Sequence, residues 1–201
     1  LKLGYALGYY LKKKNPDKVI LLCGNHDFSY LAKSRDGQSV SGHQWKHHDE
    51  ISKILHDNIS SFKAMEVIDD VAYSHAGVSK VWSFAVGAPT VEKINEKFQN
   101  VSEDWFNWNG YYDGCGNEPQ QTPFWIRPNA LIYSFDKENN MKFSKQVVGH
   151  TEMKKPSIVD SSIIKDMSKD SFLLLCDTIE RKGFQWVNNG IPEIYNSNKK
   201  D

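Results

Sequence analysis

The sequence has few cysteines, no long apolar run and no net charge, and each absence excludes a class of protein. Its 201 residues include three cysteines, which are widely spaced and form no Cys-x-x-Cys pair. This usage argues against a disulfide framework and against a zinc site with cysteine ligands. No stretch approaches the roughly 20 apolar residues of a membrane span, and the start lacks the order of a signal peptide. We therefore expect a cytoplasmic protein with no membrane partner.

The charged residues are balanced, because lysine plus arginine and aspartate plus glutamate each number 25. The resulting absence of net charge leaves no long-range field that would favour nucleic acid, so we expect no nucleic-acid partner. Any affinity for phosphate must then be local. A chain of this length suits one α/β domain, which we place over residues 1–195 with a disordered polar tail over 196–201.

Hydrophobic patterning predicts an alternation of helices and strands, and therefore a mixed α/β fold. Apolar residues recur at helical spacing before Pro16, again over 44–62, and over 78–101 with a break at Pro89. A long segment over 102–128, rich in aromatic residues, is too irregular for one element. Short apolar runs bounded by turn residues indicate strands. These runs lie at 18–23, 64–68, 71–74, 145–148, 157–160, 172–177, 184–188 and 191–195.

Three of the expected strands end in a small residue beside a histidine. Asn25 and His26 follow the strand over 18–23, His75 follows the strand over 71–74, and His150 follows the strand over 145–148. Because ligands bind at the carboxyl ends of strands in open α/β sheets, these side chains can converge there. Amide oxygen and imidazole nitrogen are competent ligands for manganese, iron or zinc, whereas a soft thiolate site would need cysteines. The pattern indicates a metal site.

The residues around these histidines spell out three ordered motifs. They are Gly-Asn-His-Asp at 24–27, Ser-His-Ala-Gly at 74–77 and Gly-His-Thr at 149–151, and 50 and 75 residues separate Asn25, His75 and His150. In order and spacing they resemble the third, fourth and fifth motifs of calcineurin-like metallophosphoesterases. The resemblance is nearest to the serine/threonine phosphoprotein phosphatase and diadenosine tetraphosphatase branch, and Glu152, where many other members have a second histidine, fits that branch.

The resemblance implies a fold and a chemistry. The fold would be a four-layer sandwich, with two mixed β-sheets flanked by helices, lacking its N-terminal strand. Asn25, His75 and His150 would ligate the second of two divalent ions, which in the family are manganese, iron or zinc. His26 would donate a proton to the leaving oxygen, and Arg127, in a Trp-x-Arg sequence with Trp125, would bind the substrate phosphate. A hydroxide bridging two ions would then hydrolyse a phosphomonoester, of a phosphoprotein or small molecule, or a phosphoanhydride.

The sequence departs from the family at its start. The family's Asp-x-His and Gly-Asp-x-x-Asp-Arg-Gly motifs, which supply the first ion's ligands, are absent from the 201 residues. The chain also opens at Leu1 within an amphipathic pattern, so we expect the missing motifs to lie upstream. An alternative hypothesis is that the chain is a catalytically incomplete fragment or remnant, acting as a metal- or phosphate-binding module.

Two further groups of residues remain open to more than one interpretation. His43 and His47, four residues apart and next to His48, could hold an extra metal ion or could lie on a solvated face. A run of aromatic residues could form a wall facing the substrate or could cover the edge of the core. These aromatic residues are Trp105, Phe106, Trp108, Tyr111, Tyr112, Phe124 and Trp125.

Overall fold

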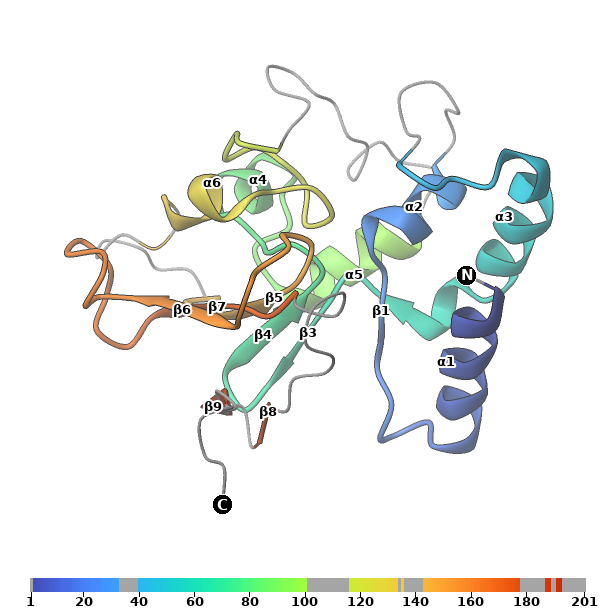
Figure 1. Ribbon diagram of the computed structural model, residues 1–201, viewed down its shortest axis with the longest axis horizontal. Coiled ribbons are helices and arrows are strands. Elements are labelled where there is room, and N and C mark those ends of the chain that lie inside the picture. The colour runs from blue at the N-terminus through green and yellow to red at the C-terminus, as the bar shows by residue number, and fades with distance from the viewer. Residues whose placement is uncertain are drawn as a thin grey trace.

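The computed structural model describes residues 2–32, 40–100, 116–133, 135, 143–177, 187–188 and 191–192, which form both helices and strands (Figure 1). The helices are α1 (Lys2–Lys14), α2 (Asn25–Leu31), α3 (His48–Asp57), α4 (Lys80–Ala85), α5 (Val91–Gln99) and α6 (Pro128–Ile132), with short 3-10 turns η1 (Trp45–His47) and η2 (Ile59–Ser61). The strands are β1 (Leu21–Leu22), β2 (Phe62–Lys63), β3 (Met65–Ile68), β4 (Val71–Ser74), β5 (Lys145–Val148), β6 (Ser157–Asp160), β7 (Phe172–Leu175), β8 (Val187–Asn188) and β9 (Ile191–Pro192).

The largest sheet has five strands in the order β3-β4-β5-β7-β6. The three central strands β4, β5 and β7 run parallel, while β3 and β6 pair antiparallel at the two edges. In the register of the parallel pairs, Ser74 lies opposite Val148 and Val148 lies opposite Leu175. The residues that follow these strands therefore emerge together at one edge of the sheet, where ligands bind in folds of this class.

The β3–β4 hairpin confirms the two strands expected around residues 64–74. Its turn is formed by Asp69 and Asp70, whose φ angles are 48° and 68°. Positive φ at both central residues is the geometry of the type I′ turn, which matches the natural twist of a hairpin and tolerates aspartate. The turn fixes the register that leaves Ser74 at the end of β4, directly before His75.

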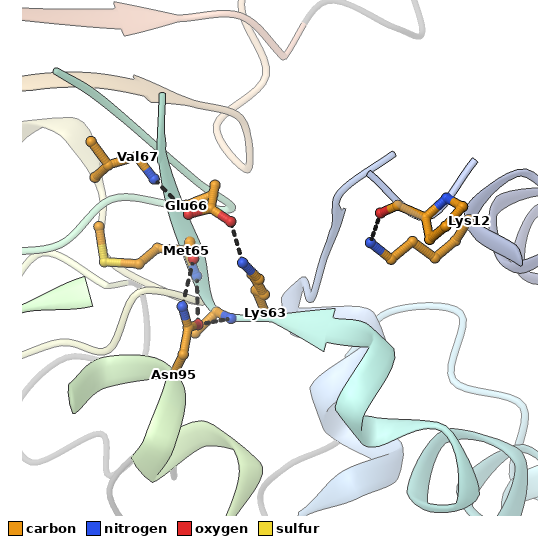
Figure 2. A network of polar contacts seen from close by, with 8 residues as sticks. Lys12, Lys63, Met65, Glu66, Val67 and Asn95 are labelled. Carbon is orange, nitrogen blue, oxygen red and sulfur yellow. Dashed lines mark hydrogen bonds and ion pairs between the residues drawn. The ribbon is translucent and has the colours of Figure 1, made fainter. Parts of the chain in front are cut away.

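A smaller parallel sheet of β1 and β2 brings the 24–27 motif close to the same region. β1 pairs with β2, and the Cys23 N–H continues the ladder by donating to the Lys63 carbonyl at 2.9 Å. Asn95 of α5 then fixes the junction between β2 and β3. Its side-chain oxygen accepts from the backbone N–H groups of Ala64 at 2.9 Å and Met65 at 3.3 Å, and its amide donates to the Met65 carbonyl at 2.9 Å (Figure 2).

Apolar side chains pack on both faces of the main sheet. The largest cluster joins α2, α3 and α5 to the β1–β2 region, and a second cluster packs α6 against β5 and β7. Cys23, directly after β1, is completely buried in the first cluster, where it packs as a small apolar residue. The opposite face carries a smaller cluster around Val71, Val147 and Leu174. These cores hold the strand ends rigidly relative to α2 and α6.

The structure confirms a mixed α/β fold and corrects details of it. The helix expected over 44–62 is divided into η1, α3 and η2, and the helix α2, which carries the first motif, was not predicted. His48, expected on the solvated face, is buried. No helix in the described part of the chain is long and apolar enough to cross a membrane. The 196–201 tail, Cys115 and the aromatic residues over 105–112 lie outside the described residues.

Candidate metal and phosphate site

Three donor atoms from separate elements converge at the edge where the parallel strands end. Asn25 is the first residue of α2, His75 directly follows β4, and His150 follows β5 after one glycine. The His75 Nε2 atom lies 2.8 Å from the Asn25 side-chain oxygen and 3.1 Å from the His150 Nδ1 atom. The structure thus brings together all three residues that the sequence analysis placed on one metal ion.

Gly24 makes room for this approach. A Cβ atom added at Gly24 would lie 2.9 Å from the His75 Nδ1 atom, closer than side chains normally pack. The backbone N–H of Gly24 donates to the Asp27 carboxylate at 2.7 Å, which fixes the first turn of α2. The glycine and the aspartate of the 24–27 motif therefore position Asn25 and clear space for His75 without being donors themselves.

His150 has an unusual backbone conformation. Its φ angle is 62°, in the left-handed region that non-glycine residues seldom adopt. Backbone hydrogen bonds from Gly149 N–H to the His75 carbonyl at 2.9 Å, and from Thr151 N–H to the Gly149 carbonyl at 2.7 Å, surround it. Such conformations persist where neighbouring contacts over-determine them, and they concentrate at functional sites. Here the bend turns the His150 ring toward His75.

Both histidines of the site are held in the neutral form. Burial lowers the pKa of His75 to about 4, with smaller contributions from the charges of His26 and Arg127. Burial also lowers the pKa of His150 to about 3, assisted by His75 and Arg127, while a polar contact with the Trp125 carbonyl acts in the opposite direction. Metal ligation requires unprotonated imidazole, so both rings are in the competent state at neutral pH.

The three donor atoms fit a divalent ion better than they fit a hydrogen-bond network. Each imidazole nitrogen has a single hydrogen-bonding position, so His75 Nε2 cannot serve both Asn25 and His150 well with one proton. Donor atoms at adjacent corners around an ion, with bonds of about 2.1 Å at right angles, lie about 3.0 Å apart. The separations of 2.8 and 3.1 Å agree with that arrangement. An oxygen and two imidazole nitrogens suit manganese, iron or zinc.

Arg127 and Trp125 flank the site from the turn that precedes α6. The Arg127 Nη1 atom donates to the His150 carbonyl and to the Thr151 hydroxyl, both at 3.2 Å. The Trp125 ring meets the His150 ring edge to face at 5.7 Å between centroids. Gly116 permits the turn, because a Cβ there would lie 2.2 Å from the Trp125 carbonyl. Thr151, the last residue of the third motif, is therefore a partner of Arg127 that the sequence analysis did not assign.

His26 occupies the first turn of α2 and its side chain is exposed. Its charge contributes to the lowered pKa of both His75 and His150, so it lies within electrostatic reach of the three donors. An exposed imidazole beside a phosphate site can exchange protons with solvent and with a leaving group. The position is compatible with the proton-donor role expected for it.

His43, His47 and His48 do not form the helical pair considered from the sequence. His43 precedes η1, and its Nε2 atom lies 3.0 Å from the His48 Nδ1 atom. His47 instead faces Glu50, with 3.5 Å between its Nδ1 atom and the carboxylate. The residues that come together are thus His43 and His48, five positions apart, which helical spacing could not indicate because His43 lies outside the helix.

A second set of candidate metal ligands is not evident among the described residues. Among them no group of three or more histidine, cysteine, aspartate or glutamate side chains is placed to hold a metal. The candidate site combines two histidines with an asparagine, so it is not a group of this kind. Ligands for a second ion, which the family resemblance requires, remain an expectation.

Comparisons with known proteins bear on the fold. No family model matches the chain, and no curated protein sequence matches it. Among solved structures, a cold-active protein-tyrosine phosphatase of the psychrophile Shewanella sp. matches over 84% of this chain with a TM-score of 0.51 at 20% identity. A mutant of a cold-active protein tyrosine phosphatase matches over 78% of this chain and 48% of its own, with a TM-score of 0.48 at 20% identity.

The match to the Shewanella protein spans 53% of that protein, so this chain corresponds to about half of its length. At 20% identity the likeness concerns the fold alone. The chain therefore has a mixed α/β fold that is similar to part of a phosphatase of known structure.

Proposed function

We propose that the chain carries the metal-binding part of a phosphoester hydrolase, which acts on a phosphomonoester or a phosphoanhydride. The observation that carries the proposal is the convergence of the Asn25 oxygen, His75 Nε2 and His150 Nδ1 within 2.8 and 3.1 Å. These residues lie on three elements far apart in the sequence. Packing that brings neutral imidazoles and an amide oxygen to one point has a clear use in holding a cation.

Each residue has a task in this proposal. Asn25, His75 and His150 hold the divalent ion at the edge of the sheet. When bound, such an ion acts as a Lewis acid toward the phosphoryl group and makes water a better nucleophile near neutral pH. Arg127, whose charge already acts on both histidines, binds phosphate oxygens. Trp125 packs against His150 and supports the wall of the site.

The proton balance assigns His26 its role. In hydrolysis, water attacks phosphorus, the bond from phosphorus to the leaving oxygen breaks, and that oxygen takes the electron pair. His26, in its protonated form, gives a proton to this oxygen and so releases an alcohol. The proton that the attacking water loses passes through solvent and restores His26. The products are the alcohol and inorganic phosphate for a phosphomonoester, and two phosphate-bearing fragments for a phosphoanhydride.

The fold comparison supports a phosphoester substrate without specifying it. The Shewanella protein of similar fold is a protein-tyrosine phosphatase, and its name implies that it acts on phosphotyrosine. We therefore take an aryl phosphate as the first substrate to test. Because this chain spans about half the length of that protein, the activity proposed is that of the whole protein to which the chain would belong.

Binding of manganese tests the proposal directly. The wild-type chain should bind one Mn²⁺ ion in a calorimetric titration, and His75→Asn should abolish this binding, because the shorter side chain cannot reach the position of Nε2. His47→Asn is the matched control, since His47 faces Glu50 and lies outside the site. Manganese-dependent hydrolysis of nitrophenyl phosphate should likewise be retained in His47→Asn and lost in His75→Asn. Unchanged manganese binding by the His75→Asn variant would contradict the assignment of His75 as a metal ligand.

A second candidate function is binding without hydrolysis. It is favoured by the lack, among the described residues, of a second set of candidate metal ligands. A module of this kind would bind manganese and inorganic phosphate together, with Arg127 next to the ion, but would not turn over aryl phosphates. Tight phosphate binding that requires manganese, combined with no hydrolysis, would select this candidate over the first.

A further inference from the structure

A second polar cluster lies beside α2, outside the three donor atoms. The Ser29 hydroxyl lies 2.8 Å from the His26 carbonyl and 3.0 Å from the His43 Nδ1 atom. On its other side, the His43 Nε2 atom lies 3.0 Å from His48 Nδ1. These contacts form one chain, from α3 across the segment before η1 to the first turn of α2.

The donor and acceptor groups of these residues allow only one direction for each hydrogen bond. The His26 carbonyl only accepts, so Ser29 must donate its single hydroxyl proton to it. Ser29 then has only lone pairs left, and His43 Nδ1 must carry a proton and donate to it. Burial lowers the pKa of His43, with His48 and His26 adding to the effect, so the ring is neutral and its Nε2 accepts from His48 Nδ1–H.

Aromatic stacking holds the middle of the chain in place. The His43 ring stacks on the Tyr30 ring at 4.2 Å between centroids, and the Trp45 ring lies 4.3 Å from it on an exposed surface. The Tyr30 hydroxyl accepts from the Gln44 backbone N–H at 2.7 Å. His43 is therefore fixed both by hydrogen bonds and by packing, while Ser29 and His48 are buried.

Helix α2 needs support of this kind. It has seven residues, and helices this short are not stable without contacts to the rest of the protein. Its first turn carries Asn25 and His26, and the Ser29 hydroxyl bonds the carbonyl of that same turn. A change in these hydrogen bonds would therefore act on Asn25 and His26 through the backbone carbonyl of His26, which Ser29 bonds.

We propose that Ser29, His43 and His48 are positioning residues, and that their hydrogen-bond chain orients His26 as the proton donor. The inference rests on the proposed function for the role of His26, and on the Ser29, His43 and His48 contacts for the geometry. His26 lies close enough to His43 for its charge to act on the His43 ring. The chain thus extends the site from the sheet edge to the N-terminus of α3.

The dependence of rate on the leaving group tests this role. A proton donor matters for a poor leaving group such as phenol and hardly at all for dinitrophenol, which leaves as a stable anion. Ser29→Ala should slow manganese-dependent hydrolysis of phenyl phosphate about tenfold or more relative to dinitrophenyl phosphate. In the background of His26→Ala, the same change should have no further effect on this ratio. Equal losses for both substrates would show a general structural role and overturn the proposal.

Two substitutions of His43 identify which link matters. His43→Asn places an amide N–H near the position of Nδ1 and can keep the bond to Ser29, whereas His43→Gln reaches only the position of Nε2. Positioning through Ser29 predicts that the asparagine variant retains the wild-type leaving-group dependence and the glutamine variant loses it. His47→Gln, next to His48 but outside the chain, should behave as wild type. The reverse order of the two His43 variants would contradict the proposal.

Nuclear magnetic resonance separates this proposal from the proposed function. Nitrogen shifts of the imidazole rings should show His43 and His48 both protonated at Nδ1, whether or not the protein hydrolyses phosphate. The His26 ring signals should move in Ser29→Ala and stay in place in His47→Gln. If the protein has no activity but His26 responds in this way, the proposed function fails and the positioning holds. His26 signals that are identical in wild type and Ser29→Ala would overturn the positioning.

Discussion

Two pairs of histidines in this protein have almost the same separation and different surroundings. His75 Nε2 and His150 Nδ1 are 3.1 Å apart, and His43 Nε2 and His48 Nδ1 are 3.0 Å apart. The first pair comes from the ends of two parallel strands, 75 residues apart in sequence. The second pair comes from adjacent segments, five residues apart.

The third partner of each pair accounts for the difference. His43 contacts Ser29, whose hydroxyl both donates and accepts, so each donor in these hydrogen bonds has an acceptor. Beside His75 stands the Asn25 oxygen, which only accepts, and the buried His150 Nε2 atom has no hydrogen bond of normal geometry among the described residues. One pair is a satisfied hydrogen-bond network, whereas the other has lone pairs in excess and is suited to a cation.

The largest expected difference between the two pairs is in the affinity for Mn²⁺. His150→Ala removes a nitrogen of the first pair, and we expect the affinity for Mn²⁺ to fall by more than about 100-fold, beyond the usual effect of outer partners. His48→Ala removes the equivalent Nδ1 atom of the second pair and should change the affinity by less than about threefold. Calorimetric titration of both variants measures this. Comparable losses in the two variants would make the second pair a metal site as well.

Gly24 provides a sharper test of the first pair, since the substitution leaves every donor in place. The Cβ of Gly24→Ala would press on the His75 ring, 2.9 Å from its Nδ1 atom, and shift Nε2 away from Asn25. We expect a loss in Mn²⁺ affinity of about 10- to 100-fold. The Ser29–His43 hydrogen bond should persist, as judged by the His43 ring signals. An unchanged affinity would mean that Mn²⁺ binding does not depend on the position of the His75 ring beside Gly24.

The local parts of the site could be predicted from the sequence. Strand runs ending at Asn25, His75 and His150 are visible as short apolar segments, and the parallel order of β4 and β5 then brings two of their ends together. The strands expected over 64–68 and 71–74 leave only residues 69–70 between them, where the structure has the hairpin turn. The three candidate ligands could therefore be predicted, because each lies within three residues of the end of a strand.

The network around Ser29 could not be predicted in this way. α2 contains only two strongly apolar positions at helical spacing, Phe28 and Leu31, so no amphipathic pattern marks it. The Ser29–His43 contact spans 14 residues through a segment without a repeating pattern. His48 is buried and contacts His43, which in turn contacts Ser29 of α2. Such pairing is decided by tertiary packing, which the order of residues does not display.

The pH dependence of stability should also differ between the pairs. The pKa of His75 is lowered to about 4 and that of His150 to about 3, so the unfolded chain binds protons below its own pKa of about 6.5 that the folded chain does not. Stability without metal should therefore fall between about pH 6.5 and pH 4, by an amount on the order of 5 kcal/mol for the two groups together, since each pKa unit corresponds to about 1.4 kcal/mol.

Urea unfolding across this range measures the effect. A His75→Gln and His150→Gln double variant should lose much of the slope, because glutamine does not titrate. His43→Gln should remove a smaller part, since the pKa of His43 is lowered in the same direction. A double variant with the full wild-type slope would contradict the assignment of the acid sensitivity to the first pair.

The smallest effect concerns the glycine beside the second pair. Gly42 has a φ angle of 77°, and an added Cβ would meet no atom within 4 Å, so Gly42→Ala introduces backbone strain without a clash. We expect a loss of about 1 kcal/mol in the free energy of unfolding. Gly87→Ala, with φ of 63° and equally open space, is the matched control on a different segment, after α4. Only Gly42→Ala should move the His43 ring signals, and neither should change Mn²⁺ affinity, because the metal donors depend on the space at Gly24 and not on this turn.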